Sequence, residues 1–501
     1  GGGGGSEGTA ARKAGEAPPL KAVALLTDWW QVLAGALTFA LSVAASGHAI
    51  LYKRDSRAAV GWVGLIWLAP VVGAALYALL GVNRIQRRAA EQRALRPGSG
   101  VFERPAPPGP PAQLPAEAAH LAPLAELVQR LTARPLTGGN AVTPLVNGDA
   151  AYPAMLAAID AGQRTIGLST YIFDNDAVGR TFLDALERAR HRGVEVRVLI
   201  DAVGARYSWP PIFRALRARG IAAAAFGRTL LPWRMPYLNL RNHRKLLVVD
   251  GQVGFTGGMN IRAGHLLASR PRHPVQDLHF RLEGPVVRHL VQAFADDWSF
   301  TTEETLEGEA WFPDLRPAGP VLARGLTDGP DEDFEKARFT RLGALACARE
   351  EVRIVTPYFL PDAGLVSELG VTAMRGVRVE ILLPAVNNLA LVQWASTAEL
   401  WQVLGRGCLV YYTPPPFDHT KLLLVDRVWA LIGSSNWDPR SLRLNFEFDV
   451  ECYDAALAKQ LNRLVETKLA GARPVTLEEV NGRSLPIKLR DGVARLAGPY
   501  L

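Results

Sequence analysis

The sequence is poor in cysteine. Its 501 residues include three cysteines, Cys347, Cys408 and Cys452, and an odd number at wide spacing fits neither a disulfide framework nor a zinc cluster. Clusters of His, Asp and Glu at the spacing of metal ligands are also missing. We therefore expect a protein of a reducing compartment whose chemistry needs no metal or other cofactor.

Acidic residues are outnumbered: 48 Asp and Glu stand against 56 Lys and Arg, which gives a formal net charge of +8 and a pI near 9.5. Such a balance favours an anionic partner, either a nucleic acid or an anionic membrane, and charge alone does not choose between them. Hydrophobic residues make up 49% of the chain, and its mean hydropathy is +0.06, which is rare for a soluble enzyme. Part of the apolar content is therefore expected to lie in lipid.

Asp, Glu, Lys and Arg are absent from two long stretches near the N-terminus, residues 29–52 and 58–82. Each exceeds the roughly 20 residues that cross a bilayer core. Trp29 and Tyr52 mark the ends of the first stretch, where amphipathic rings favour the lipid–water boundary. We predict a transmembrane hairpin of two helices over residues 28–83; a buried hairpin of a soluble protein is the alternative.

Basic residues indicate the orientation of this hairpin. Five arginines follow the second stretch, between residues 84 and 96, against three basic residues in the loop at 53–57. The balance favours cytoplasmic termini and a cytoplasmic catalytic region, in a multi-pass protein of a bacterial inner membrane. Residues 84–135 are basic and Pro-rich and are expected to form a linker, with a semi-rigid spacer from Pro97 to about Pro123, and residues 1–27 a flexible lead.

The remainder of the chain repeats itself in two halves, residues 136–310 and 311–501. In the first half the pattern predicts, in order, a strand, a helix and a strand at residues 165–173, 178–192 and 194–200. In the second half it predicts a strand at 352–359, a helix ending near Gly376 and a strand at 377–383. This pattern indicates two α/β sandwich halves with right-handed crossovers, related by a pseudo-twofold axis.

Each half contains a His-x-Lys-x4-Asp motif followed by a Gly- or Ser-rich turn and an Asn. The first copy consists of His243, Lys245, Asp250, Gly258 and Asn260. The second consists of His419, Lys421, Asp426, Ser434, Ser435 and Asn436. Because residues i and i+2 of a strand share a face, His and Lys are expected to converge on one site. The Asp of each motif lies an odd number of residues after the His. We therefore expect it on the opposite face of the strand, where it organises the motif.

Two imidazoles, two ammonium groups and two amides around one point would form an electropositive pocket rich in donors, which suits a phosphoryl group. A neutral imidazole can attack phosphorus, and a protonated one can supply a proton to the leaving oxygen. One histidine of each kind allows a two-step displacement through a phosphohistidine. The turns after the motifs allow backbone N–H groups to approach an anion.

These motifs resemble those of the phospholipase D superfamily, and within it the bacterial cardiolipin synthases, over roughly residues 50–455. The resemblance is carried by residues 240–251 (LRNHRKLLVVDG), by 433–447 (GSSNWDPRSLRLNFE) and by the second apolar stretch. It implies transfer of a phosphatidyl group from one phosphatidylglycerol to another at the lipid bilayer, giving cardiolipin and glycerol. Residues 261–264 (IRAG) depart from the acidic stretch usual in that branch, which leaves the acceptor lipid in doubt.

The resemblance also assigns roles. It implies that His243 is the nucleophile and His419 the general acid and base, and the reverse assignment stays open. It implies that the phosphate is held by Lys245, Lys421, Asn260 and Asn436, with Gly258, Ser434 and Ser435 beside it. In related enzymes a downstream carboxylate orients each histidine and fixes its tautomer. The candidates here are Asp277 and Glu447, and an ordinary strand-edge ion pair is the alternative for each.

Other functions fit the motif. A phospholipase D that releases phosphatidic acid differs only in the group that attacks the phosphohistidine, and a synthase could use phosphatidylethanolamine as co-substrate. A phosphodiesterase of nucleic acids would use the basic surface but not the hairpin, so no nucleic-acid partner is expected. Residues 229–237 are interpreted either as a loop that enters the bilayer interface or as a loop packed on the core. Tyr171 and Tyr358 are interpreted either as residues that line the lipid entrance or as core residues. The sequence does not indicate the oligomeric state.

Overall fold

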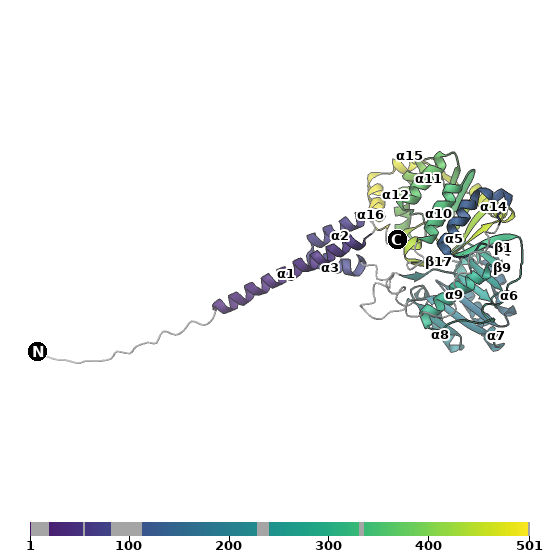
Figure 1. The fold of residues 1–501 in the computed structure, drawn as a ribbon, viewed down its shortest axis with the longest axis horizontal. Coiled ribbons are helices and arrows are strands. Elements are labelled where there is room, and N and C mark those ends of the chain that lie inside the picture. The colour runs from purple at the N-terminus through teal and green to yellow at the C-terminus, as the bar shows by residue number, and fades with distance from the viewer. Residues whose placement is uncertain (2–19, 54–55, 82–112, 228–239, 330–334, 499–501) are drawn as a thin grey trace. The chain divides into compact units, whose positions relative to one another are not determined.

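The computed structural model describes residues 1, 20–53, 56–81, 113–227, 240–329 and 335–498 of the chain. The chain divides into two compact units, Gly1–Arg84 and Ile85–Leu501. The first unit is small and helical, and the second is the larger α/β unit (Figure 1).

The small unit is built on one long helix, α1 (Leu20–Tyr52), against which α2 (Ser56–Leu68) and α3 (Pro70–Leu76) pack. Within α1, the segment Trp29–Tyr52 is long and apolar enough to cross a membrane. A short π-helical segment, Tyr77–Gly81, follows α3. The Tyr77 hydroxyl lies 2.7 Å from Nδ1 of His48, which links the end of this unit back to α1.

The second apolar stretch does not form the single spanning helix that the sequence predicts. Ala69 leaves the helical conformation (φ −139°, ψ 74°), as expected for a residue that precedes a proline, and Pro70 then begins α3. The stretch is therefore divided into shorter apolar helices, Ala58–Leu68 and Pro70–Leu79. Among the described residues, one helix has the length of a span, and the second arm of the predicted hairpin is not supported by length.

One continuous sheet of 16 strands runs through the larger unit: 15 strands follow one another, and the short β5 (Arg241–Asn242) pairs with β17 beside them. Outward from its centre, the first half contributes β1 (Thr137–Val146), β9 (Leu278–Glu283), β7 (Val253–Gly257), β6 (Leu246–Val249), β2 (Thr165–Thr170), β3 (Glu195–Asp201) and β4 (Ala222–Phe226). The second half contributes β10 (Val321–Asp328), β17 (Asn445–Tyr453), β16 (Trp429–Gly433), β15 (Leu422–Val425), β11 (Glu351–Val355), β12 (Arg378–Pro384), β13 (Leu409–Thr413) and β18 (Arg473–Val475). β1 and β10 pair antiparallel at the centre, and the order outward from them is equivalent on both sides. The predicted pair of related α/β halves is thus confirmed.

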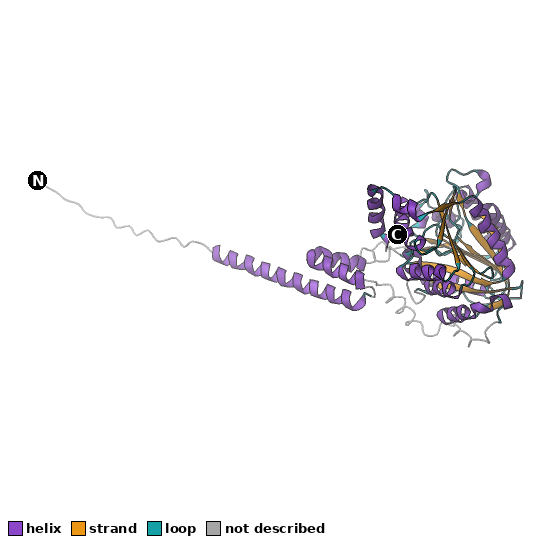
Figure 2. Cartoon of the chain, turned by 90° about the horizontal axis from the view of Figure 1, so that it is seen from above, coloured by secondary structure: helices purple, strands orange, loops and turns teal. Residues whose placement is uncertain are grey.

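Helices cover both faces of this sheet (Figure 2). One face carries α9 (Val287–Thr302) and α14 (Ala455–Ala470), whose buried residues share one core with strands of both halves. The other face carries α6 (Asn147–Ala161), α7 (Ala177–His191) and α8 (Ile212–Ala218) on the first half and α10 (Lys336–Cys347), α11 (Ala363–Met374) and α12 (Ala390–Leu404) on the second. The shared core makes the two halves a single body, so side chains from both can be held in one fixed site.

The strand–helix–strand units expected from the repeat are present in both halves. β2, α7 and β3 form the first, and β11, α11 and β12 form the second, with parallel strands in each. α7 ends at His191, and Gly193 takes a positive φ of 87° that favours glycine. β2 and β11 are shorter than expected, because the chain leaves the sheet at Thr170 and Val355.

The expected linker, residues 84–135, which contains the expected spacer, includes two helices. A 3-10 segment (Ala116–Leu121) and α5 (Ala122–Thr132) bury Leu121, Leu124 and Val128 in the core of the second half, against α10. The spacer prediction is wrong for this part, because the apolar spacing of α5 outweighs the prolines around it; residues 84–112 lie outside the described residues. At the other end of the chain, α15 (Leu477–Gly482) and α16 (Leu485–Leu496) pack on α12.

Candidate active site

The two histidine motifs meet where the halves exchange short strands. β5 (Arg241–Asn242), which leads into the first motif, pairs with β17 of the second half. β14 (Phe417–Asp418), which leads into the second motif, pairs with β8 (Val275–Gln276) of the first half. The backbone N–H of each histidine continues this pairing: His243 donates to the Phe446 carbonyl at 2.9 Å and His419 to the Gln276 carbonyl at 2.8 Å.

The sequence predicts that His and Lys of each motif lie on one face of a strand, but in the structure they do not. They lie in the extended segment before the strand: residues 243–245 precede β6 and residues 419–421 precede β15. Each lysine instead turns back on its own histidine, because its ammonium donates to the histidine carbonyl at 2.6 Å in both copies. The predicted convergence of His and Lys is therefore reached through a backbone hydrogen bond.

Each imidazole is paired with a carboxylate of the opposite half. Nδ1 of His243 lies 3.0 Å from Glu447, and Nδ1 of His419 lies 2.8 Å from Asp277. Both carboxylate side chains are fully inaccessible to solvent. Because the carboxylate occupies Nδ1, the other ring nitrogen is left for chemistry. The two candidate orienting residues thus reach the histidines, and the pairing is crossed between halves.

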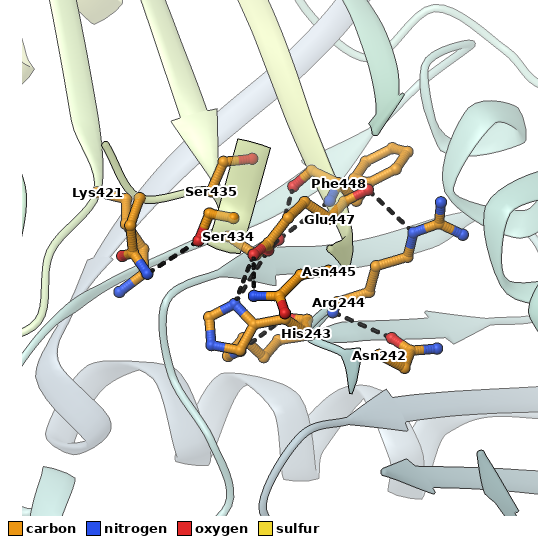
Figure 3. A network of polar contacts seen from close by, with 12 residues as sticks. Asn242, His243, Arg244, Lys421, Ser434, Ser435, Asn445, Glu447 and Phe448 are labelled. Atoms are coloured by element: carbon orange, nitrogen blue, oxygen red, sulfur yellow. Dashed lines mark hydrogen bonds and ion pairs between the residues drawn. The ribbon is translucent and has the colours of Figure 1, made fainter. Parts of the chain in front are cut away.

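The two carboxylates are supported differently. Ser434 Oγ donates to Glu447 at 2.5 Å, and Asn445 Nδ2 donates to its other oxygen at 3.1 Å (Figure 3). At the equivalent place in the first half, a Cβ on Gly258 would lie 2.2 Å from Oδ1 of Asp277. Gly258 and Ser434, expected beside the phosphate, thus contact the orienting carboxylates.

The backbone N–H groups of Ser434 and Ser435 do not point to an anion site. Both donate to Oδ1 of Asp449 at 3.1 Å. Asp449 is buried, and so is Arg341, whose guanidinium lies 3.6 Å from it and donates to the Ser435 carbonyl. The expectation that this turn presents its N–H groups to a substrate is therefore corrected, and Asp449 and Arg341 are residues that the motif alone does not reveal.

The two asparagines follow β7 and β16 at equivalent positions. Oδ1 of Asn260 accepts from the N–H of Ile172 at 3.1 Å. Nδ2 of Asn436 lies 3.2 Å from the Ser441 hydroxyl, and its Oδ1 is buried with no hydrogen-bond partner among the residues described. Both amides are thus held at the carboxyl ends of their strands, the edge of the sheet where the motifs meet.

Asp250 and Asp426, the last residues of the two motifs, do not lie with these groups. The Asp250 carboxylate accepts the backbone N–H groups of residues 163–165 at 2.7 to 2.9 Å. Asp426 accepts those of residues 349–351 at 2.8 to 3.0 Å and also binds His120. Each caps the start of the neighbouring strand, which fits the expected organising role and separates both residues from the catalytic group.

Burial shapes the electrostatics of the site. It lowers the pKa of His243 and His419 well below the ordinary value, and the lysine charges lower the pKa of both imidazoles further. Burial also lowers the pKa of Lys245 to about 7 and that of Lys421 to about 8, opposed by the two buried carboxylates. Lys421 acts on His243 and Lys245 on His419, so the four side chains form one electrostatic unit. Burial and the lysine charges thus disfavour the protonated form of both imidazoles.

Aromatic rings cover the two imidazoles. The Tyr171 ring centroid is 5.3 Å from that of His243, and the Tyr358 and Phe417 centroids are 6.3 Å and 5.9 Å from that of His419. Both tyrosines thus lie in the site rather than in a remote core. The loop at 229–237 lies outside the described residues. Within the described part of the chain, no group of three His, Cys, Asp or Glu could hold a metal ion.

Comparison of the sequence with known proteins identifies its family. The family model described as "Cardiolipin synthase, PLD-like domain" matches residues 155–298 and 342–469, and "Phospholipase_D-nuclease N-terminal" matches 40–81. The chain is 32% identical to the major cardiolipin synthase of Bacillus subtilis, covering 90% of this chain and 95% of that protein. It is 31% identical to cardiolipin synthase A of Pseudomonas fluorescens, covering 93% and 97%.

Among solved structures, the phosphatidylserine synthase of Haemophilus influenzae is similar, with a TM-score of 0.59 and 16% identity. The match covers 75% of this chain and all of that one. At this identity the likeness concerns the fold alone.

Proposed function

The chain belongs to the family of cardiolipin synthases with phospholipase D-like domains, and from this premise we propose that it joins two phosphatidylglycerol molecules through a phosphohistidine formed at one shared site. The enzyme is a phosphatidyltransferase; the intermediate, the residue roles and the acceptor are the proposal. The observation that carries it is the crossed arrangement, in which each half supplies one imidazole and the carboxylate of the other. Among the described residues, neither catalytic histidine pairs with a carboxylate of its own half.

In the first step, the free ring nitrogen of His243 attacks the phosphorus of one phosphatidylglycerol. The bond from phosphorus to the glycerol headgroup oxygen breaks, and His419, as imidazolium, gives that oxygen its proton, so that glycerol leaves. The phosphatidyl group is then bound to His243, and Glu447 stabilises the positive charge that this ring acquires. The anionic phosphate of the bound lipid raises the pKa of His419, so that this ring takes up a proton from water before it acts as the acid.

In the second step, His419 acts as a base. It takes the proton from a glycerol hydroxyl of a second phosphatidylglycerol, whose oxygen attacks the phosphorus. The bond between phosphorus and the His243 nitrogen breaks, and cardiolipin is released. Lys245, Lys421 and the two asparagine amides hold the non-bridging oxygens in both steps.

The surroundings of the two rings favour His243 as the nucleophile. Burial and the lysine charges lower the pKa of His243, and the charge of Arg440, on α13 (Pro439–Arg443), lowers it further. At His419 the carboxylate of Asp418 acts in the opposite direction, because its negative charge favours the protonated ring. Of the two imidazoles, His243 is thus better suited to stay neutral and attack, and His419 to carry the proton.

The test is the product formed from labelled phosphatidylglycerol in bilayers by the purified full-length chain. Cardiolipin with an equal amount of glycerol supports the proposal; phosphatidic acid alone would indicate a hydrolase, and cardiolipin only when phosphatidylethanolamine is added would indicate another co-substrate. His243→Ala and His419→Ala are each expected to lose product formation while staying folded. His191→Ala, an exposed histidine at the end of α7, is the matched control and is expected to keep activity.

We also propose that α1 crosses a bacterial inner membrane and that α2 and α3 return as the second arm of a hairpin, with the catalytic unit in the cytoplasm. The support is the spanning length of α1 and the excess of arginine after the apolar stretches. The test uses two variants, one with a cysteine at Ser56 and one with a cysteine at Leu477, each treated with an impermeant reagent in intact cells. Labelling at position 477 and not at 56 would contradict this orientation.

A further inference from the structure

The last helix of the chain, α16, presents an exposed apolar stripe. Leu485, Leu489, Val493 and Leu496 are between 61% and 79% exposed. Their spacing of four, four and three residues places them on one face of the helix. The opposite face is buried: Ala494 and Asp491 are at most 2% exposed, and α16 packs on α12 there. The helix is therefore anchored on one face and apolar on the other.

Basic residues border this stripe. At 100° per residue, Lys488 and Arg495 fall along one edge of the stripe and Arg490 along the other. The guanidinium of Arg490 lies over the ring of Trp394 at 4.4 Å, and that of Arg495 lies 3.4 Å from Glu399. Both guanidinium groups are thus held against α12. An apolar face bordered by cations is the pattern of a helix that lies in the interface of an anionic membrane.

The buried face of α16 lies near the active site. On its buried side, Ala494 belongs to a cluster with Leu360 and Val392, against which Tyr358 packs. The Tyr358 ring is the one that lies 6.3 Å from His419. The Tyr358 hydroxyl donates to Asn388, at the start of α12, at 2.9 Å. A membrane in contact with α16 would thus be close to the rim of the site.

The other rim of the site, on the first half, is also apolar and exposed. Tyr207 packs on Tyr171 with ring centroids 6.2 Å apart, and Tyr171 in turn covers His243. Two residues farther along, Trp209 is 89% exposed. In the second half, Val386 and Leu389 are exposed on either side of Asn387 and Asn388 in the sequence. A water-soluble substrate needs no such surface, whereas a phospholipid headgroup must be reached at the bilayer surface.

We propose that α16 is an interfacial helix. Leu485, Leu489, Val493 and Leu496 enter the headgroup–acyl boundary of an anionic bilayer, and the bordering arginines and lysine bind its phosphates. This seats the mouth of the active site on the lipid surface, so that both substrate headgroups enter without leaving the membrane. The proposal deepens the proposed function by naming the surface from which that site takes its lipids.

A functional test separates docking from chemistry. The variant L485Q/L489Q/V493Q, in the full-length chain, is compared with V371Q/M374Q, which removes exposed apolar residues of α11. We expect the α16 variant to lose about tenfold or more of its rate on long-chain phosphatidylglycerol in bilayers, with its rate on a monomeric short-chain phosphatidylglycerol unchanged. The α11 variant should keep both rates. Equal rates of the α16 variant and the wild type on bilayers would overturn the proposal.

A second measurement does not depend on turnover and therefore remains valid if the proposed function fails. Spin labels are placed at Val493→Cys or Met374→Cys, two positions of equal exposure (67%), in a Cys347→Ser background and in nanodiscs of phosphatidylglycerol and phosphatidylcholine in equal parts. We expect the label at 493 to be accessible to oxygen and shielded from a water-soluble nickel complex, and the label at 374 to behave in the opposite way. A label at 493 that is as accessible to nickel as that at 374 would refute membrane docking. Dipolar broadening between labels at 493 would instead indicate a second copy of the chain on this face, and would refute it too.

Discussion

Replacing Glu447 by glutamine tests the crossed pairing most sharply. The substitution keeps the shape of the side chain but removes the charge that faces Nδ1 of His243 at 3.0 Å. The amide must also replace an acceptor that Ser434 and Asn445 now use at 2.5 and 3.1 Å. A buried hydrogen bond to a charged group contributes about 1.5–3 kcal/mol. At about 1.4 kcal/mol per factor of ten, kcat for cardiolipin formation should fall about 10- to 150-fold.

The matched variant is Asp277→Asn, which makes the same change at His419. Its loss on phosphatidylglycerol should be similar, but its cause differs, because His419 protonates the leaving oxygen. A phosphatidyl ester of p-nitrophenol has a leaving group that needs no proton. With this substrate, we expect the Asp277→Asn variant to regain the rate of nitrophenol release in the first turnover, and the Glu447→Gln variant not to regain it.

Stopped-flow absorbance of nitrophenol release, with the enzyme in bilayers, measures this first turnover directly. Rescue of Glu447→Gln and not of Asp277→Asn would reverse the roles of the two histidines. Rates within twofold of wild type for both variants on phosphatidylglycerol would refute the reasoning that the buried carboxylates act on the reaction.

Three further outcomes are expected. Burial lowers the pKa of Lys245 to about 7. Because kcat/KM reports the free enzyme, it should fall as the pH rises above 7 in a pH–rate profile. The Lys245→Arg variant should move that fall to higher pH. Asp250→Ala removes the acceptor of three backbone N–H groups and should lower the free energy of unfolding by about 3 kcal/mol. We expect a lower Tm and a near wild-type activity per folded molecule. A normal Tm with lost activity would instead assign Asp250 to catalysis. Gly258→Ala would place a Cβ 2.2 Å from the Asp277 carboxylate and should reproduce the kinetic defect of Asp277→Asn; wild-type kinetics would show that the carboxylate position is not critical.

The sequence predicts the architecture of the larger unit well, for identifiable reasons. The apolar runs after Lys245 and Lys421 specify buried strands, and both are buried as β6 and β15. The strand–helix–strand units are local patterns, so their order and approximate ends can be read from periodicity and from the glycine that ends each helix. Where periodicity competes with composition, as in α5 among prolines, composition is misleading.

The parts that the sequence could not predict are contacts between distant segments. Asp277 is much closer in sequence to His243 than to His419, yet it binds His419, because β8 pairs with β14 of the other half. No local signal encodes that pairing. Likewise, the N–H groups of Ser434 and Ser435 point to Asp449, since the buried strand β17 places that carboxylate behind the turn. In the small unit, the break at Pro70 was within reach of the sequence, because proline restricts the residue before it.

The central claim is that the two halves form one site with one nucleophile, and mapping the covalent intermediate tests it most directly. Full-length enzyme turning over radiolabelled phosphatidylglycerol is quenched in denaturant near neutral pH, which preserves both the phosphorus–nitrogen bond and the acyl esters, and is digested for mass spectrometry. We predict a phosphatidyl adduct on His243 alone, at no more than one per chain. Equal labelling of His243 and His419, or rapid turnover with no adduct on either, would contradict the account.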